Sequence, residues 1–132
     1  MSYLLDTDTC SAYLKGNRTV WQKFMQYAGR LHISAVTAGE LFVWGFRAKG
    51  TAAKRQSVFD LMSDMTFLPV DRDISQRFGE VRAAQLDQGR TTPTLDLFVA
   101  ATALVHSLTL VTHNVSDFVT IPTLSIEDWL VP

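Results

Sequence analysis

The chain has 132 residues, of which 47% are hydrophobic and 19% are charged, and 12 Lys and Arg against 13 Asp and Glu leave a formal net charge of −1. This length suits one compact domain with a sizeable core. The composition excludes a disordered or collagen-like chain. The small net charge excludes a generally basic protein, so an anionic substrate would need a local positive patch or metal ions.

The predicted elements alternate along the chain. In order they are a strand at 3–5, helices at about 7–14 and 19–27, a strand at 31–33, a helix from Ser34 or Thr37 to Ala48, a helix at 52–65, a strand at 66–70, helices at 73–88 and 92–105, and strands at 108–112 and 124–126. This alternation predicts an α/β fold, a three-layer α/β/α sandwich with a central parallel sheet. No repeat or linker interrupts the sequence, so we expect a single domain over residues 1–132.

The cellular setting is inferred from what the sequence lacks. The single cysteine, Cys10, excludes internal disulfides and Cys-rich zinc sites, which indicates a reducing compartment. We see no export signal at the start. The most apolar stretch, 97–111, is too short and too polar to span a bilayer. We therefore expect a cytoplasmic protein that does not enter a membrane.

Acidic side chains occur just beyond the predicted strands, where open α/β sheets form their sites. Asp6 follows the first strand, Glu40 lies in the helix after the second, and Asp117 follows the fourth. Asp96 interrupts an otherwise apolar helix. Four carboxylates at one sheet edge repel one another unless a cation offsets their charge. Oxygen ligands favour Mg²⁺ or Mn²⁺, and such a site suits phosphodiester hydrolysis.

Each acid also has a structural explanation. Asp6 is a candidate helix N-cap, and Thr37-Ala38-Gly39-Glu40 matches a capping box. Asp96 near a helix start complements the macrodipole, and Asn114-Val115-Ser116-Asp117 is a further cap-like pattern. For Asp8, a helix cap is favoured over a fifth acid of the site. His113, between Thr112 and Asn114, is a further candidate, but a position outside the site is favoured.

Five blocks of the sequence form a pattern when they are taken together. They are Tyr3-Leu4-Leu5-Asp6-Thr7-Asp8, the segment from Ile33 to Leu41, Thr92-Pro93-Thr94-Leu95-Asp96 with its continuation to Ala101, the segment from Leu110 to Phe118, and Glu127-Asp128-Trp129. These blocks resemble the PIN-domain family, and their length and spacing resemble the VapC-type toxins of toxin–antitoxin modules. They appear in the family's order and span nearly the whole chain.

The resemblance implies a Mg²⁺-dependent or Mn²⁺-dependent endoribonuclease that leaves a 3′-hydroxyl and a 5′-phosphate. The family's catalytic acids match Asp6, Glu40, Asp96 and Asp117. By the same analogy Asp6, Asp96 and Asp117 hold metal, and Glu40 completes the site or helps to activate water. The accessory polar residues match Thr112 and Asn114. The expected substrates are loops of tRNA or rRNA.

The resemblance also implies a VapB-type antitoxin as partner and a homodimer. Residues 41–59 contain no acid, and their cations are candidates for contacts with the RNA backbone: Arg47, Lys49, Lys54 and Arg55. The alternative is an ordinary solvated helix face. The same segment carries more large apolar side chains than one helix face buries, and we expect some to meet the antitoxin or the second subunit: Leu41, Phe42, Trp44 and Phe46.

Three other functions fit parts of the pattern. A phospho-acceptor signalling domain also uses acids at strand ends, but it needs a Lys beyond a late strand, and the last Lys here is Lys54. A PIN-fold binding module without catalysis is disfavoured by the four acids. A PIN nuclease that acts on other RNA or on DNA, outside a toxin–antitoxin module, is disfavoured by the minimal length. A short antitoxin reading frame upstream would distinguish the last alternative.

Overall fold

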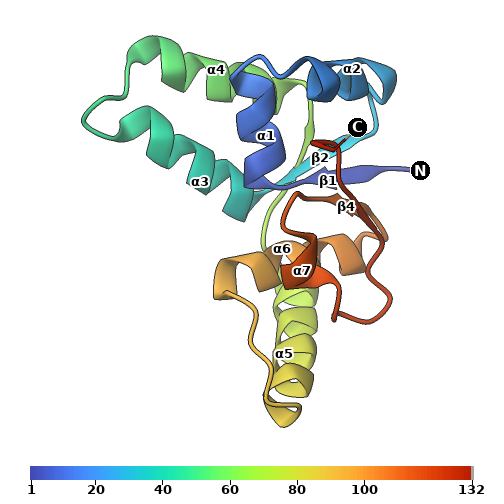
Figure 1. Ribbon diagram of the computed structural model, residues 1–132. Helices are drawn as coiled ribbons and strands as arrows, with labels where there is room; N and C mark the ends of the chain where they lie inside the picture. The colour runs from blue at the N-terminus through green and yellow to red at the C-terminus, as the bar shows by residue number, and fades with distance from the viewer. Residues whose placement is uncertain (132) are drawn as a thin grey trace.

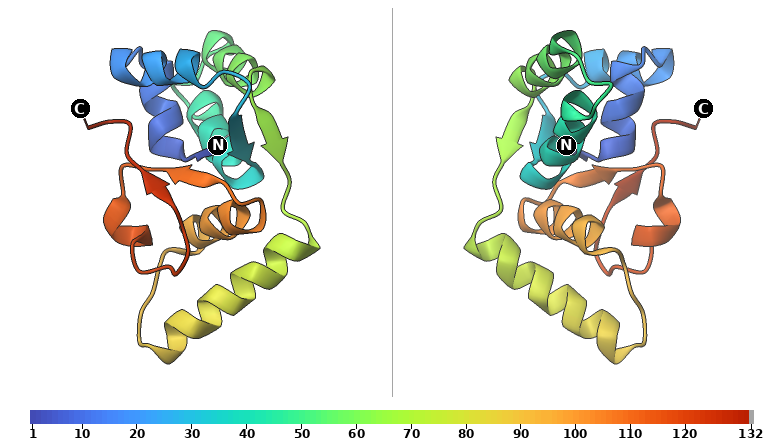
Figure 2. Two further views of the ribbon diagram at one scale, coloured as in Figure 1. Left: turned by 90° about the vertical axis from the view of Figure 1, so that its right-hand side faces the viewer. Right: turned by 90° about the vertical axis from the view of Figure 1, so that its left-hand side faces the viewer.

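The computed structural model describes residues 1–131, which form a sheet between two layers of helices (Figures 1 and 2). The elements in chain order are β1 (Tyr3–Leu5), α1 (Thr7–Leu14), α2 (Arg18–Gln26), β2 (Leu31–Ser34), α3 (Ala35–Phe46), α4 (Ala52–Ser63), β3 (Thr66–Leu68), α5 (Arg72–Asp87), α6 (Thr94–Val105), β4 (Thr109–Val111), α7 (Val115–Phe118) and β5 (Ile126–Glu127). The predicted α/β three-layer fold with a parallel sheet is confirmed.

The sheet has the strand order β3-β2-β1-β4-β5, and every pair of neighbours is parallel. The chain first builds outward from β1 through β2 to β3, and then returns to place β4 on the other side of β1. The carboxyl ends of β1 and β4 therefore form a switch point, where adjacent connections leave in opposite directions. Asp6 and Thr112 directly follow these two strands, so the topology brings them together.

Alternating side chains of β1 divide the core in two. Tyr3 and Leu5 pack with α1 to α4, and Leu4 packs with α5 to α7. In Figure 1 helices α1 to α4, the first helical layer, lie above the sheet, and helices α5 to α7, the second helical layer, lie below it. Because the three side chains are all buried, β1 is covered on both faces, as its continuous apolar sequence predicts.

Helix starts are fixed by polar side chains that accept the N–H group three residues on. Five helices begin this way, with Asp6, Asn17, Ser34, Thr51 and Asp71 as N-caps. The Asp6 cap agrees with the structural explanation given for that residue. The capping box at Thr37 is wrong, because Ser34 accepts the N–H of Thr37 and the helix has already begun.

Most predicted elements are present with small shifts at their ends. Helix α3 ends at Phe46 rather than Ala48, and the last strand is Ile126–Glu127 rather than 124–126. The sequence did not predict α7, whose four residues are too few for a periodic pattern. Within residues 1–131, every helix is too short or too polar to cross a membrane.

Candidate active site

A pocket of about 160 Å³ lies at the carboxyl ends of the strands, and we call it the acid pocket. Its lining comes from α1, α3 and α6 and from the segment after β4, and consists of Asp6, Thr7, Asp8, Thr37, Glu40, Asp96, Val99, Asn114 and Phe118. Three of the four predicted acids line this pocket, since Asp117 is absent from its lining. Thr112 is buried and is likewise absent from the lining of the pocket.

Asp6 is buried, and several hydrogen-bond donors hold its side chain. Its Oδ1 accepts the Thr9 N–H at 2.9 Å, and the Thr112 hydroxyl also bonds to its side chain. Burial raises the pKa of this carboxyl above its ordinary value, these hydrogen bonds lower it, and the Asp8 charge raises it, with burial the strongest effect. Asp6 thus acts as the N-cap of α1 and also turns toward the pocket.

Glu40 is positioned by a contact that the sequence did not reveal. The Thr7 hydroxyl donates to its Oε1 at 2.6 Å, from the first residue of α1 to the middle of α3. Thr7 adjoins Asp6 and belongs to the first block of the family resemblance, but nothing local indicates a bond across 33 positions. A charge-assisted hydrogen bond of this length fixes the carboxylate direction.

Asp96 lies in the first turn of α6 and has other carboxylates around it. Burial raises the pKa of Asp96, and the charges of Asp117, Glu40, Asp6 and Asp8 raise it further, in that order. The charge of Asp117 therefore affects the cluster although its side chain does not line the pocket. Crowding of this kind is typical of sites that bind a cation.

Asp8 and Asn114 form a pair across the rim. The Asn114 amide donates to Asp8 Oδ2 at 3.2 Å, and the Asn114 N–H donates to the Thr112 hydroxyl at 3.0 Å. The prediction that Asp8 caps α1 is wrong, because Asp6 does so. Asn114 stands at the N-cap position of α7, as the cap-like pattern predicts, but its side chain makes no cap bond and donates to Asp8 instead.

A buried polar chain supports α7 from behind. The Gln85 amide donates to the Thr92 hydroxyl at 2.7 Å, and this hydroxyl contacts the main-chain carbonyl of Asp117 at 3.3 Å. Both residues were missed as contributors to the site. The available signal was Gln85 itself, a polar residue on the otherwise apolar face of α5.

His113 points away from the acids. It is exposed, does not line the acid pocket, and its Nδ1 lies 3.0 Å from Asp128 Oδ2, so it lies outside the site, which is the alternative that the sequence favours. Across the described residues, three His, Cys, Asp or Glu side chains do not converge closely enough to hold a metal ion between them. The acids face one pocket from its different walls, as mutual repulsion favours.

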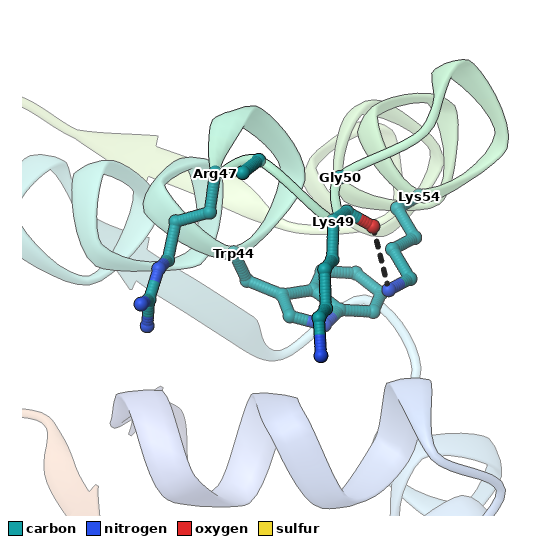
Figure 3. Close-up of a pocket in the computed structure, with 6 residues that line it drawn as sticks. Trp44, Arg47, Lys49, Gly50 and Lys54 are labelled. Carbon is teal, nitrogen blue, oxygen red and sulfur yellow. Dashed lines mark hydrogen bonds between the residues drawn. The ribbon is translucent and has the colours of Figure 1, made fainter.

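The predicted basic residues gather at the turn from α3 to α4. Arg47, Lys49 and Lys54 line a second pocket with Trp44, Ala48 and Gly50, and we call it the basic pocket (Figure 3). Arg55 is not part of its lining: its guanidinium donates to the Gly45 carbonyl at 3.1 Å and ties α4 to α3.

The large apolar residues of α3 have different environments. Leu41 is buried, and Phe42 packs against Phe59 of α4 at a ring-centroid distance of 4.9 Å. Phe46 is 67% exposed. The expectation that α3 carries more large apolar side chains than it buries thus holds at Phe46, whereas Leu41 belongs to the core.

Comparison with known proteins gives a consistent result. A family model described as PIN domain matches residues 3–122. Ribonuclease VapC2 of Haemophilus influenzae is 26% identical, over 98% of this chain and 99% of that protein. The tRNA(fMet)-specific endonuclease VapC of Salmonella typhimurium is 27% identical, over 98% of each.

Solved structures of similar sequence share the fold over nearly the whole chain. The DNA-bound VapBC structure from Salmonella typhimurium superposes with a TM-score of 0.92 at 27% identity, over 98% of both chains. VapBC-1 from nontypeable Haemophilus influenzae gives a TM-score of 0.85 at 28% identity, over 98% of this chain and 99% of that one.

Proposed function

The chain belongs to the PIN-domain family, and from this premise we propose that it is an endoribonuclease that hydrolyses RNA phosphodiester bonds at the acid pocket. One observation carries the proposal: Asp6, Glu40 and Asp96 come from three distant parts of the sequence and line one pocket at the switch point of the sheet. The full-length relatives named as ribonucleases support RNA as the substrate. Those named as tRNA(fMet)-specific endonucleases support tRNA as the target.

The donor set fits Mg²⁺ or Mn²⁺. All candidate ligands are carboxylate oxygens, and Mg²⁺ is typically held by one or two carboxylates while it retains waters and binds substrate phosphates. Asp6 and Asp96 would hold the cation, directly or through water, and Asp117, whose side chain does not line the pocket, would act on it through water. When bound, a divalent cation lowers the pKa of water and offsets the charge of the phosphate. Burial and the charges of the neighbouring carboxylates raise the pKa of Asp96, and a cation would relieve the effect of those charges, which supports this assignment.

In this proposal the protein side chains orient water and substrate. Glu40, held by the Thr7 hydroxyl, takes the proton of the water that attacks phosphorus. The P–O3′ bond breaks, the 3′ oxygen takes a proton from solvent, and the products are a 3′-hydroxyl and a 5′-phosphate. The Thr112 hydroxyl orients the Asp6 carboxylate, and the Asn114 amide orients the Asp8 carboxylate at the rim of the acid pocket.

We further propose that the chain is the toxin of a toxin–antitoxin pair and that a VapB-type antitoxin covers its first helical layer. The neighbouring structures described as VapBC complexes support this. So do large apolar side chains on α2, α3 and α4 that are at least half exposed: Trp21, Met25, Val43, Phe46 and Phe59. A homodimer stays part of the proposal by analogy with the family.

The test compares the wild-type protein with Asp6→Asn on total cellular RNA, with Mg²⁺, with Mn²⁺ and with chelator, and sequences the new RNA ends. Asn retains the N-cap of α1, so the fold should persist. We expect discrete metal-dependent cuts that fall at least about 100-fold in the variant. Asp87→Asn, an exposed acid at the end of α5, is the matched control. No cleavage by folded wild-type protein loaded with metal would refute the nuclease.

A further inference from the structure

We infer that the basic pocket at the α3–α4 turn is a nucleotide subsite, which binds RNA next to the acid pocket. The inference rests on the proposed function, because it states how the RNA of that reaction would be held. The pocket has a volume of about 470 Å³ and combines an indole ring with three cations. Its lining is shown in Figure 3.

One face of α3 connects the two pockets. Thr37 and Glu40 line the acid pocket, and Trp44, one turn further along, lines the basic pocket together with Arg47, the residue that directly follows α3. Residues separated by three, four or seven positions share a helix face. At 1.5 Å per residue, Glu40 and Trp44 are about 6 Å apart along the axis. An RNA strand that leaves the acid pocket along this face therefore reaches the basic pocket directly.

Two of the cations are available to an anionic ligand. Arg47 and Lys49 are exposed and form no ion pair among residues 1–131. Figure 3 shows both side chains extending from the turn in the same direction. Residues 41–59 contain no acid that would compete for them, although the chain as a whole has a net charge of −1. Positive charge is thus concentrated beside the pocket whose acids would otherwise repel a polyanion.

The third cation, Lys54, holds the Trp44 ring in place and is not assigned to a phosphate. The Lys54 ammonium lies 5.4 Å from the centre of the Trp44 ring and donates to the Lys49 carbonyl at 3.3 Å. Lys54 thereby holds the half-buried indole and the turn in one arrangement. Aromatic rings beside cations bind single-stranded RNA, since bases stack on the ring while phosphates contact the cations. We assign the base to Trp44 and the phosphate to Arg47 and Lys49.

The test measures binding without cleavage. A fluorescein-labelled single-stranded oligoribonucleotide of mixed sequence is titrated with the full chain in chelator, at several salt concentrations. For the double variant Arg47→Gln/Lys49→Gln we expect about tenfold weaker binding at low salt. The slope of log Kd against log salt should fall by about 1.4, because each phosphate contact on a single strand contributes about 0.7.

The matched control removes two exposed cations elsewhere. Arg30→Gln/Arg72→Gln changes the net charge equally, at the start of β2 and on α5, and should leave affinity and slope unchanged. Trp44→Leu should weaken binding without changing the slope, since it removes stacking but no charge. Its thermal unfolding is measured alongside, because Trp44 packs against the core.

The outcomes separate this inference from the nuclease proposal. Wild-type affinity and slope in the Arg47/Lys49 variant, or an equal loss in the control pair, would overturn the subsite. If the wild-type protein cleaves no RNA with metal but the Arg47/Lys49 variant alone loses binding, hydrolysis is refuted and the subsite stands. If the wild type cleaves and that variant binds normally, only the subsite is refuted.

Discussion

Helix α3 and the residue that follows its C-terminal end differ in how firmly their polar side chains are held. Within the helix Thr37 is buried, and Glu40 accepts the Thr7 hydroxyl at 2.6 Å. At the C-cap, Arg47 is exposed and forms no ion pair within residues 1–131. The helix therefore carries a carboxylate held by a hydrogen bond and is followed by a cation that no ion pair restrains.

This difference matches two different requirements. Chemistry at a phosphorus atom depends on atoms placed within a fraction of an ångström, so the side chain that handles the proton needs a partner that orients it. Side chains that contact a phosphate backbone need less exact placement, because they act through charge. They position the nucleic acid and take no part in the reaction. The two regions should therefore be separable by substitution, with changes at one leaving the other intact.

The strongest disruption of the basic pocket should come from Gly50→Ala. A Cβ at this position would lie 2.0 Å from the Gly45 carbonyl oxygen and 2.9 Å from the Arg47 carbonyl oxygen, so the backbone of the turn must shift. We expect a loss of about 1–3 kcal/mol in the free energy of unfolding, measured by chemical denaturation. RNA affinity should fall as well, while Mn²⁺ binding at the acid pocket, followed by calorimetry, stays the same.

The control for that change is Gly79→Ala in α5, where a Cβ meets no atom within 4 Å. Ala is the better helix former, so this variant should gain about 0.5–1 kcal/mol. A Gly50→Ala protein as stable as Gly79→Ala would show that the turn adapts freely. The basic pocket would then be less defined than its contacts indicate.

The converse disruption is Thr7→Val, which acts on the acid pocket alone. It keeps the shape of Thr7 but removes the hydroxyl that orients Glu40. Loss of such a supporting contact typically costs about 10–100-fold in activity. We expect that loss in the rate of RNA cleavage, with unchanged RNA affinity in chelator. Thr7→Ser should restore most of the rate, and equal rates for Val and Ser would mean that the bond has no role in positioning.

The local parts of the fold and site could be predicted from the sequence. Continuous apolar runs predicted β1 and β4, and strand ends pointed to Asp6. The position of Asp96 near a helix start was also clear from sequence, because an acid inside an apolar segment stands out. These features depend on neighbours within a few positions, which is the range that pattern and propensity cover.

The parts that escaped prediction depend on distant contacts. The bond from Thr7 to Glu40 spans 33 positions, and that from Asn114 to Asp8 spans 106. The capping box at Thr37 failed for a related reason: Ser34, three residues earlier, also suits an N-cap, and pairing of β2 with its neighbours decides where the helix begins. Sequence thus indicated which residues matter before it could indicate what holds them.

The smallest expected effect concerns the burial and the charge crowding of Asp96, and Asp96→Asn measures the two together. Because the pKa of Asp96 is raised, the folded state binds more protons than the unfolded state between the ordinary value near 3.9 and the raised value. Stability contributed by this group is therefore present at low pH and lost as pH rises through that window. In chelator at neutral pH, Asp96→Asn should melt about 2–4 °C above the wild type. Asp87→Asn should melt with the wild type.

Two changes of conditions should remove or reverse that difference, and both follow from the charge of Asp96. Below about pH 3 the wild-type carboxyl is protonated in both states, so the two proteins should melt together. With Mn²⁺ in excess the order should reverse, since a ligand that binds only the folded state stabilises the protein that retains the carboxylate. A lower melting temperature for Asp96→Asn in chelator would mean that the N-terminal end of α6 stabilises this charge more than the neighbouring acids destabilise it. Repulsion could then not be the reason why the acid pocket needs a cation.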